Sequence, residues 1–216
     1  MPGDYPSVVI YGTGGHAKIV FDILNLKKVP VAGFLSEQEV DKNQHFLSRP
    51  VFGTEEKLKL EDKPFDAAVV ALGDSEKREK ISSIFRTYKI PLFTAVHPQA
   101  VISRGVKFSR GCIICGGAFI GPDVTLGESV VINSGAVIEY QCKLGDFSRV
   151  SAGAVLCSSV VLKNRVFVGA GATVIDGVKI EEKSIVGAGA VVTGNIKSGQ
   201  LVKGIPARSY SKPVHF

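Results

Sequence analysis

Residues Gln99 to Gly194 repeat every six positions and read, in groups of six, QAVISR GVKFSR GCIICG GAFIGP DVTLGE SVVINS GAVIEY QCKLGD FSRVSA GAVLCS SVVLKN RVFVGA GATVID GVKIEE KSIVGA GAVVTG. The second place of each group is mostly small, as at Ala118, Ala136 and Cys142. The fourth place is always aliphatic or aromatic: Ile102, Phe108, Ile114, Ile120, Leu126, Ile132, Ile138, Leu144, Val150, Leu156, Leu162, Val168, Val174, Ile180, Val186 and Val192.

A period of six fits neither the 3.6 residues of a helical turn nor the two-residue alternation of a half-buried strand. It is typical of a parallel β-helix, in which each group forms one short flat side and the chain then turns a corner. With three sides per coil, residues 18 apart stack, and the sixteen groups make a little over five coils. A β-sandwich would have to produce sixteen unbroken repeats by chance. The sequence therefore predicts a parallel β-helix here.

The composition is that of an ordinary globular chain of 216 residues, with 45% hydrophobic and 21% charged residues. No apolar run approaches the ~18 residues that would span a bilayer, so we expect no membrane span. The start, MPGDYPSVVIYG, lacks the basic-then-apolar order of a signal peptide, which predicts a cytoplasmic protein. The net charge of +6 is spread along the chain, which favours a solvated surface or small phosphorylated ligands over nucleic acid.

The four cysteines do not predict a metal site. Cys112 and Cys115 form a C-x2-C pair, but no second close pair follows it, and Cys142 and Cys157 stand alone. In the six-residue frame, these side chains fall at second and fifth places on different sides of the predicted prism. We interpret them as small, reduced packing residues and predict no metal.

A strand, a glycine-rich turn and a helix are predicted at the start of the chain. The apolar run Ser7–Tyr11 ends at Gly12-Thr13-Gly14-Gly15-His16, and apolar residues at helical spacing follow. Glycines let a backbone approach a phosphate, and a helix N-terminus offers free N–H groups to it. Ala17 stands where the last glycine of a full dinucleotide motif would be. A tight turn without a ligand is therefore the alternative reading.

Two further strands are predicted to end at the same edge of a parallel sheet. Val31–Leu35 ends at Ser36 and Glu37, where a nucleotide-binding domain places a ribose-binding acid, although Glu37 also fits an exposed loop. Asp66–Leu72 ends at Gly73, and Ser75 is a plausible cap for the helix that follows. The sequence thus predicts an α/β, Rossmann-like domain over residues 1–92, large enough for one nucleotide, and a β-helix domain over residues 93–216.

The chain resembles the bacterial sugar O/N-acetyltransferases of the NeuD/PglD type over essentially its whole length. The resemblance rests on YGTGGHAK (11–18), VALGDSEKREKI (70–81), VHPQA (96–100), GAVIEYQCKLGDFSRVSAGA (135–154) and VKGIPAR (202–208). It implies a homotrimer of left-handed β-helices that carries an acetyl group from acetyl-CoA to a nucleotide-activated amino sugar, in surface polysaccharide or glycan assembly. Acetyl-CoA is the implied co-substrate, bound between adjacent prisms, with no metal.

The resemblance also implies roles for individual residues. The nucleotide sugar would contact Gly12, Thr13, Gly14, Gly15, His16, Ser36, Glu37 and Gly73. Acetyl-CoA would lie along Arg149, Ala170, Ala188, Lys203 and Arg208. The catalytic positions would be Glu139, Tyr140 and Gln141.

These catalytic positions depart from the family pattern. Members usually carry His-Asp or His-Glu after Ile-Glu, with the histidine as general base, whereas this chain has Tyr140-Gln141. A second family histidine, in GDF-x-His, is Arg149 here. Histidine titrates near neutrality and can take a proton at pH 7, whereas tyrosine, with a pKa of ~10, is a poor base. The histidines of the chain, at 16, 45, 97 and 215, all fall outside this part of the prism.

Three readings follow from the missing histidines. In the first, positioning and oxyanion donors drive the attack of an amine, and Tyr140 orients or relays. In the second, Glu139 or Asp146 acts as the base. In the third, the acetyltransferase activity has been lost, and the protein binds sugar nucleotide or CoA as a scaffold.

Overall fold

The computed structural model describes residues 5–41, 43–59 and 63–210. The chain divides into two compact units. Unit 1 comprises residues 1–98 together with 110–113, and unit 2 comprises residues 99–109 together with 114–216.

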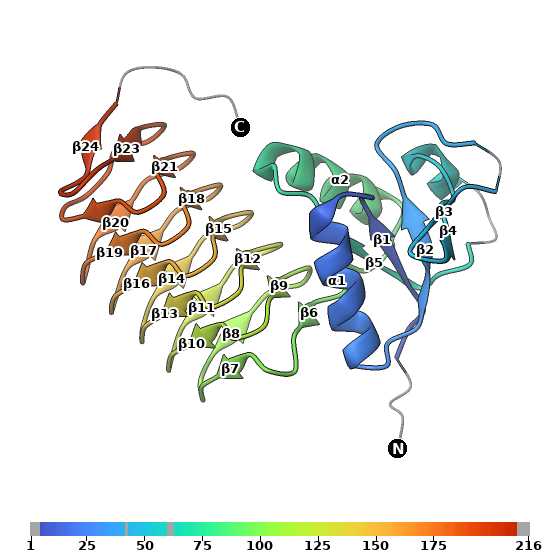
Figure 1. The fold of residues 1–216 in the computed structure, drawn as a ribbon, viewed down its shortest axis with the longest axis horizontal. Helices are drawn as coiled ribbons and strands as arrows, with labels where there is room; N and C mark the ends of the chain where they lie inside the picture. Colours follow the sequence, from blue (N-terminus) through green and yellow to red (C-terminus); the bar gives the residue numbers. More distant parts are fainter. Residues whose placement is uncertain (1–4, 42, 60–62, 211–216) are drawn as a thin grey trace. The chain divides into compact units, whose positions relative to one another are not determined.

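Unit 1 is built on a parallel sheet with the strand order β2-β1-β5 (Figure 1). Single-residue bridges, Phe34 to Val51 and Ala68 to Leu92, continue the sheet at its two edges. All four residues of β5 are buried, as expected for a strand covered on both faces. The elements are β1 (Val8–Tyr11), α1 (Gly15–Leu26), β2 (Val31–Leu35), β3 (His45–Phe46), β4 (Arg49–Pro50), the 3-10 helix η1 (Glu55–Lys59), β5 (Ala67–Val70), α2 (Ser75–Thr87) and β6 (Ala95–Val96).

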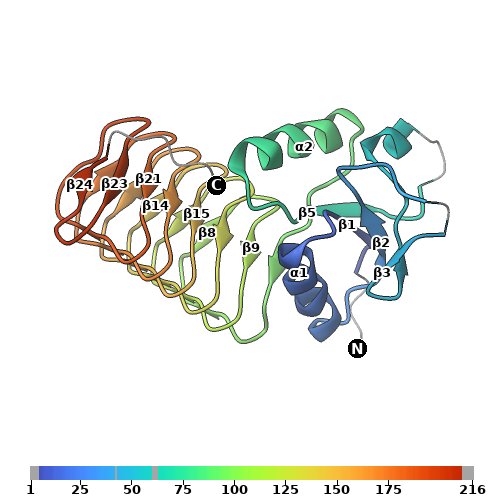
Figure 2. The same cartoon turned by 45° about the horizontal axis from the view of Figure 1, so that its top comes forward.

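The two helices of unit 1 cover opposite faces of its sheet (Figure 2). Helix α1 buries its apolar residues at 17, 20, 23 and 24, and α2 buries Ile81 and Phe85. Phe85 lies edge-on to Tyr11 of β1, with the ring centroids 6.2 Å apart. This packing fixes the helix N-termini near the carboxyl ends of the strands, and the predicted Rossmann-like architecture is confirmed.

Unit 2 is the predicted left-handed parallel β-helix, with one two-residue strand for each six-residue group (Figure 1). We name its three sides by their sheets: side 1 is β7-β10-β13-β16-β19-β22, side 2 is β8-β11-β14-β17-β20, and side 3 contains β9-β12-β15-β18-β21-β23-β24. The strands are β7 (Val101–Ile102), β8 (Lys107–Phe108), β9 (Ile113–Ile114), β10 (Phe119–Ile120), β11 (Thr125–Leu126), β12 (Val131–Ile132), β13 (Val137–Ile138), β14 (Lys143–Leu144), β15 (Arg149–Val150), β16 (Val155–Leu156), β17 (Val161–Leu162), β18 (Phe167–Val168), β19 (Thr173–Val174), β20 (Lys179–Ile180), β21 (Ile185–Val186), β22 (Val191–Val192), β23 (Leu201–Lys203) and β24 (Arg208–Ser209).

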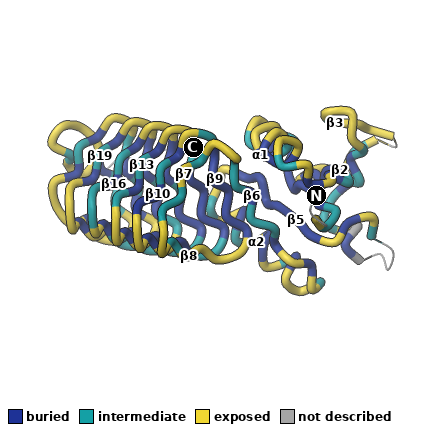
Figure 3. The backbone as a smooth tube through the Cα atoms, turned by 90° about the horizontal axis from the view of Figure 1, so that it is seen from below, coloured by how far each residue is buried: buried dark blue, intermediate teal, exposed yellow. Residues whose placement is uncertain are grey.

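The stacking has the predicted register of 18 residues, for example Ile120 beside Ile138 and Ile138 beside Leu156. Fourth-place side chains point inward and are fully buried through the middle coils, while third-place side chains point outward. Figure 3 shows the consequence: buried stretches lie within the sides, and exposed stretches lie at the corners. In the first coil, by contrast, Phe108 is 42% exposed because it has a neighbouring coil on one side only.

Candidate functional site

A cavity of about 420 Å³ opens at the carboxyl ends of β1, β2 and β5 in unit 1. The residues predicted to hold a sugar nucleotide all line it, and three others, which the sequence analysis did not name, join them. Two of these three directly adjoin a predicted residue in the sequence, and the third, Ala71, lies two residues before Gly73. The lining is Gly12, Thr13, Gly14, Gly15, His16, Ser36, Glu37, Gln38, Ala71, Leu72 and Gly73.

The glycines leave the backbone of the first turn open to a ligand. Gly12 has a φ of +115°, and a Cβ there would come within 3.0 Å of the Ala71 carbonyl oxygen. A Cβ on Gly14 or Gly15 would meet nothing within 4 Å. Gly14 caps α1 without a side-chain hydrogen bond, and the first turn holds no acidic residue. The N–H groups at this helix end are therefore suited to an anion.

An ion pair joins the ends of β2 and α2 at this cavity. The Lys77 ammonium lies 2.9 Å from Glu37 Oε1, and both side chains are largely exposed. The hydrogen bond and the charge of Glu37 raise the pKa of Lys77.

The N-cap of α2 is Asp74, so the prediction that Ser75 caps this helix was wrong. The Asp74 carboxylate accepts the Lys77 N–H at 2.8 Å, and Ser75 is the first helical residue. The carboxylate reaches the N3 amide because Asp74 is still extended.

A buried arginine fixes the strand end that lines the cavity. Arg78 of α2 is 0% exposed, and its Nη1 donates to the carbonyl oxygens of Leu72 at 3.0 Å and Gly73 at 3.1 Å. Beneath the cavity, the Tyr11 hydroxyl donates to Glu55 Oε2 at 2.8 Å. Burial, followed by the hydrogen bond and charge of Glu55, raises the pKa of Tyr11 above its ordinary value. Sequence reasoning missed both contacts: Tyr11 and Glu55 are 44 residues apart, and the burial of Arg78 depends on how α2 packs on the sheet.

The predicted catalytic residues lie at one corner of the prism, between β13 on side 1 and β14 on side 2. Tyr140 is 49% exposed, and its hydroxyl makes no hydrogen bond to another described residue. Gln141 turns the corner with a φ of +59°, and its Oε1 accepts from the Ser159 hydroxyl at 3.5 Å. Glu139 is half-buried beside them. The structure therefore leaves the Tyr140 phenol available to a ligand.

Asp146 occupies a different corner, between side 2 and side 3. Its Oδ1 accepts the Glu128 N–H at 2.8 Å, and its own N–H donates to Asn164 Oδ1 at 3.1 Å. Asp146 thus links three successive coils. Its side chain and backbone therefore have a structural role between the coils.

The residues predicted to bind acetyl-CoA lie along side 3 and the corner that follows it. Arg149 is in β15, with its guanidinium carbon 5.8 Å from the centre of the Phe167 ring. Burial lowers the pKa of Arg149, and the neighbouring Cys115 thiol partly offsets this. Ala170 and Ala188 are exposed at the corner between sides 3 and 1, one coil apart. Each precedes a glycine of positive φ, at 171 and 189.

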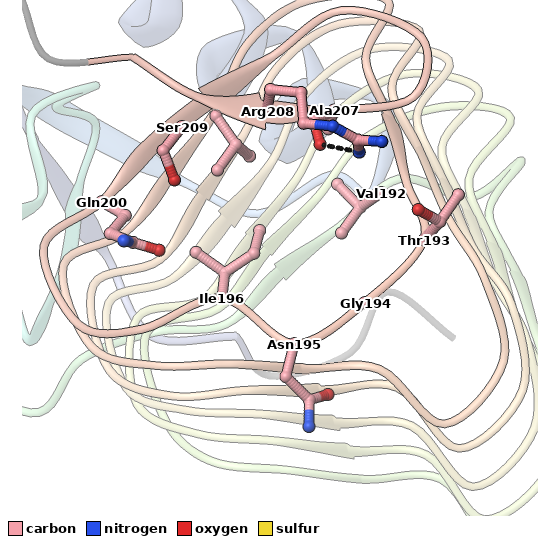
Figure 4. A pocket seen from close by; sticks show the side chains of 10 residues that line it. Val192, Thr193, Gly194, Asn195, Ile196, Gln200, Ala207, Arg208 and Ser209 are labelled. Atoms are coloured by element: carbon pink, nitrogen blue, oxygen red, sulfur yellow. Dashed lines mark hydrogen bonds between the residues drawn. The ribbon is translucent and has the colours of Figure 1, made fainter.

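At the C-terminal end of the prism, a cavity of about 250 Å³ contains Arg208 (Figure 4). The Arg208 guanidinium donates to the Ala207 carbonyl at 3.0 Å (Figure 4). Lys203 pairs with Arg208 in the β23–β24 ladder, and its ammonium lies 3.4 Å from the Tyr210 ring centre. The lining is Val192, Thr193, Gly194, Asn195, Ile196, Gln200, Val202, Ala207, Arg208 and Ser209.

Within one chain, the structure does not bring all these prism residues together. Tyr140 lies at the corner between sides 1 and 2, whereas Ala170 and Ala188 lie at the corner between sides 3 and 1. The full width of side 1, six residues or up to ~20 Å of extended chain, separates the two corners. No cluster of three His, Cys, Asp or Glu side chains able to hold a metal occurs among residues 5–41, 43–59 and 63–210. In that same part of the chain, neither α-helix has the length and hydropathy needed to cross a bilayer.

Comparisons with known proteins identify both halves of the chain. A model of the PglD N-terminal domain matches residues 7–85, and a model of the bacterial transferase hexapeptide (six repeats) matches residues 159–194. No match was found among curated proteins.

Solved structures match nearly the whole length. A histidine-to-alanine variant of GDP-perosamine N-acetyltransferase from Caulobacter crescentus, in complex with CoA and GDP-perosamine, is 34% identical, with a TM-score of 0.91 over 95% of this chain and 97% of that one. The acetyltransferase domain of PglB from Neisseria gonorrhoeae is 25% identical, with a TM-score of 0.87 over 94% and 99%. WeeI from Acinetobacter baumannii, at 19% identity and a TM-score of 0.69 over 94% and 99%, shares the fold. Identity of this extent over both units shows that the chain belongs to the bacterial sugar acetyltransferases of the NeuD/PglD type.

Proposed function

We propose that this chain moves an acetyl group from acetyl-CoA to the amine of a nucleotide-linked amino sugar, for surface polysaccharide or glycan assembly. The observation that carries the proposal is the 34% identity, over 95% of this chain, to a GDP-perosamine N-acetyltransferase whose structure holds CoA and GDP-perosamine. Both substrates are cytoplasmic metabolites, and we place the reaction in the cytoplasm.

The nucleotide sugar binds in the cavity of unit 1. The open backbone of Gly12 to Gly15 and the N-terminus of α1 suit a diphosphate, which carries the negative charge that free N–H groups attract. Ser36 and Glu37 stand at the end of β2, where hydroxyls of a ribose are bound in sheets of this type. Glu37 is the acidic residue in a lining otherwise made of glycines and neutral side chains. A cavity of about 420 Å³ fits one nucleotide better than two.

Acetyl-CoA binds along the corner between sides 3 and 1. The exposed positions Ala188 and Ala170 leave room for an extended arm, and their backbones offer hydrogen bonds to its amide groups. Lys203 and Arg208 stand at the end of this path and supply positive charge for the CoA phosphates. At the other end of the path is Arg149.

A trimer completes the site, because the corner that carries Tyr140 and the corner that carries Ala170 meet only when copies pack side by side. Side 1 also presents an outward apolar column that suits burial against another copy. Its third-place residues are Val101, Phe119, Val137, Val155, Thr173 and Val191. The column on side 2 is mostly polar: Lys107, Thr125, Lys143, Val161 and Lys179.

Sedimentation velocity tests the trimer with the double variant Val137→Glu/Val155→Glu. We expect the wild type to sediment as a trimer and the variant to dissociate, because two carboxylates would be buried in the contact. Val161→Glu, which adds one carboxylate at the same place of a group on side 2, is the control and should remain trimeric. A monomeric wild type, or an unchanged double variant, would exclude side 1 as the contact.

The reaction proceeds without a histidine base at the prism. An uncharged amine attacks a thioester with less help from a base than a hydroxyl needs, so the missing histidines favour N-acetylation. Tyr140 orients the sugar through its exposed phenol, and Glu139 and Gln141 flank it. Positioning of the two substrates supplies much of the rate.

Release of free CoA thiol tests the function. Acetyl-CoA would be offered with GDP-, UDP- and dTDP-linked amino sugars and with the matching hydroxy sugars, using wild type, Tyr140→Phe and Tyr140→His. We expect turnover with an amino sugar and a clear loss in Tyr140→Phe. Acetylation of a hydroxy sugar at a comparable rate would overturn the preference for an amine. Activity that appears only in Tyr140→His would mean that the chain binds these ligands without catalysing transfer.

A further inference from the structure

Arg149 is a half-buried cation that has no counter-ion among residues 5–41, 43–59 and 63–210. Its Nε is shielded from solvent and has no hydrogen-bond partner, and no ion pair joins its guanidinium to any described residue. The contacts that it does make are with the Phe167 ring and, through its charge, with the Cys115 thiol. Burial raises the pKa of Cys115 to about 11, so this neighbour stays an uncharged thiol near neutral pH. A buried guanidinium nitrogen without a partner is costly and indicates that a ligand completes it.

A second buried polar atom near Arg149 also lacks a partner. In the side 3 ladder, Val131 lies beside Arg149, and Asn133 follows it two residues later. Asn133 Oδ1 is buried and accepts no hydrogen bond. This part of side 3 thus offers one donor and one acceptor, on neighbouring coils, to a ligand that has both a carbonyl oxygen and an N–H group.

The distance from Arg149 to the basic end of the prism matches the reach of CoA. From β15 the sheet continues through β18 and β21 to β23, which contains Lys203. Three strand spacings correspond to about 14 Å. The pantetheine arm has about twelve bonds between its phosphate oxygen and its sulfur, and an extended chain covers about 14 Å with that number. With the phosphates at Lys203, the thioester therefore reaches Arg149.

We infer that Arg149 stabilises the negative charge that forms on the acetyl oxygen during transfer; this inference rests on the proposed function. The lone pair of the neutral sugar amine attacks the thioester carbon, and the C=O π electrons move to oxygen. The oxyanion lies against the Arg149 guanidinium, and an N–H of the attacking nitrogen lies against Asn133 Oδ1. The nitrogen then loses a proton to water, the C=O bond re-forms, and the C–S bond breaks to release the CoA thiolate, which takes up a proton.

The first test separates catalysis from binding in Arg149→Met and Arg149→Lys. Removal of one oxyanion donor typically lowers kcat by 10²–10³-fold. We expect a loss of about 10²-fold in kcat for Arg149→Met, a smaller loss for Arg149→Lys, and a change of less than about threefold in the Kd of CoA by calorimetry. Lys143→Met, which removes one positive charge at the same place of the preceding group on side 2, should leave kcat unchanged. An unchanged kcat in Arg149→Met, or a Kd for CoA weakened as much as kcat, would overturn the inference.

The second test does not need turnover, and it distinguishes failure of this inference from failure of the proposed function. Infrared difference spectra of bound acetyl-CoA labelled with ¹³C at the carbonyl report the polarisation of that bond. We expect the wild type and Lys143→Met to shift the carbonyl band to lower frequency, and Arg149→Met to lose the shift. A shift without turnover on any sugar would uphold the contact and reject the transferase, whereas a shift that survives in Arg149→Met would reject the contact.

Discussion

Arg78 Nη1 lies 3.0 Å from the Leu72 carbonyl oxygen, so a fully buried guanidinium of α2 holds the end of β5 in place. The same nitrogen donates to Gly73 at 3.1 Å. These two carbonyls belong to residues that line the cavity of unit 1. The stability of unit 1 and the shape of this cavity are therefore linked through one side chain.

Arg78→Leu should test this link. Two carbonyl oxygens would lose their charged donor, and we expect a loss of about 2–4 kcal/mol in the free energy of unfolding, together with weaker nucleotide binding. Urea denaturation and calorimetry with GDP and UDP measure the two effects. Lys80→Leu, an exposed change on the same helix, is the control. Equal stability of Arg78→Leu and Lys80→Leu would contradict the proposed role.

Gly12→Ala and Gly14→Ala should differ, although the two glycines are neighbours in the same turn. Gly12 has a φ of +115°, and its Cβ would press on the Ala71 carbonyl oxygen, whereas Gly14 has a φ of −92° and open space around it. We expect the free energy of unfolding to fall by about 1–3 kcal/mol in Gly12→Ala and by less than about 1 kcal/mol in Gly14→Ala. Thermal unfolding of the two variants under the same conditions measures both losses of stability. A larger loss in Gly14→Ala than in Gly12→Ala would contradict the prediction.

The N-cap of α2 offers a matched pair of substitutions in adjacent residues. Asp74→Ala removes the carboxylate that accepts the Lys77 N–H, and we expect it to cost about 1 kcal/mol. Ser75→Ala changes the first helical residue, where the side chain caps nothing, and should be within about 0.5 kcal/mol of wild type. Chemical denaturation of both variants checks the assignment. A greater cost in Ser75→Ala would restore serine as the cap.

The raised pKa of Tyr11 predicts a stability that falls at alkaline pH. Above pH 10 the unfolded chain ionises this tyrosine while the folded chain keeps it protonated, so rising pH favours unfolding by up to about 1.4 kcal/mol per pH unit. Tyr11→Phe removes both the hydrogen bond to Glu55 and this titration. We expect it to be less stable than wild type by about 1 kcal/mol at pH 8, with a gap that narrows at pH 11. A gap that stays constant from pH 8 to pH 11 would refute the role of Tyr11.

The sequence predicted the prism in detail because its repeat specifies each local choice. Every six-residue group carries one inward side chain, and the strands from Val101–Ile102 to Val191–Val192 follow the groups one by one. The cavity of unit 1 was also predictable, because glycines and polar residues directly follow apolar strands. The β3–β4 hairpin was not, since its turn residues, Leu47 and Ser48, have positive φ values that these residue types seldom adopt.

Other features could not be predicted because they depend on how the elements pack against one another. Arg78 looks like an ordinary charged residue in SEKREK, and its burial follows from the packing of α2 on the sheet. Asn133 likewise belongs to a standard group, SVVINS, and the sequence does not show that its side-chain oxygen is buried. The roles that we propose for Tyr140 and Arg149 came from departures from the family pattern, which spacing alone does not reveal.

The uninterrupted count of six has a consequence for the evolution of this scaffold. A single inserted residue would turn inward side chains outward in every later group, and six inserted residues would move every later group to the wrong side. A whole coil restores the faces and lengthens the prism by about 4.8 Å. Such a coil has 18 residues through the repeats and 16 residues from Ile185 to Leu201. The separation between Arg149 and Lys203 can therefore change only in steps of that size. Small insertions therefore cannot adjust this separation to an acyl donor whose arm is longer or shorter by less than one coil spacing.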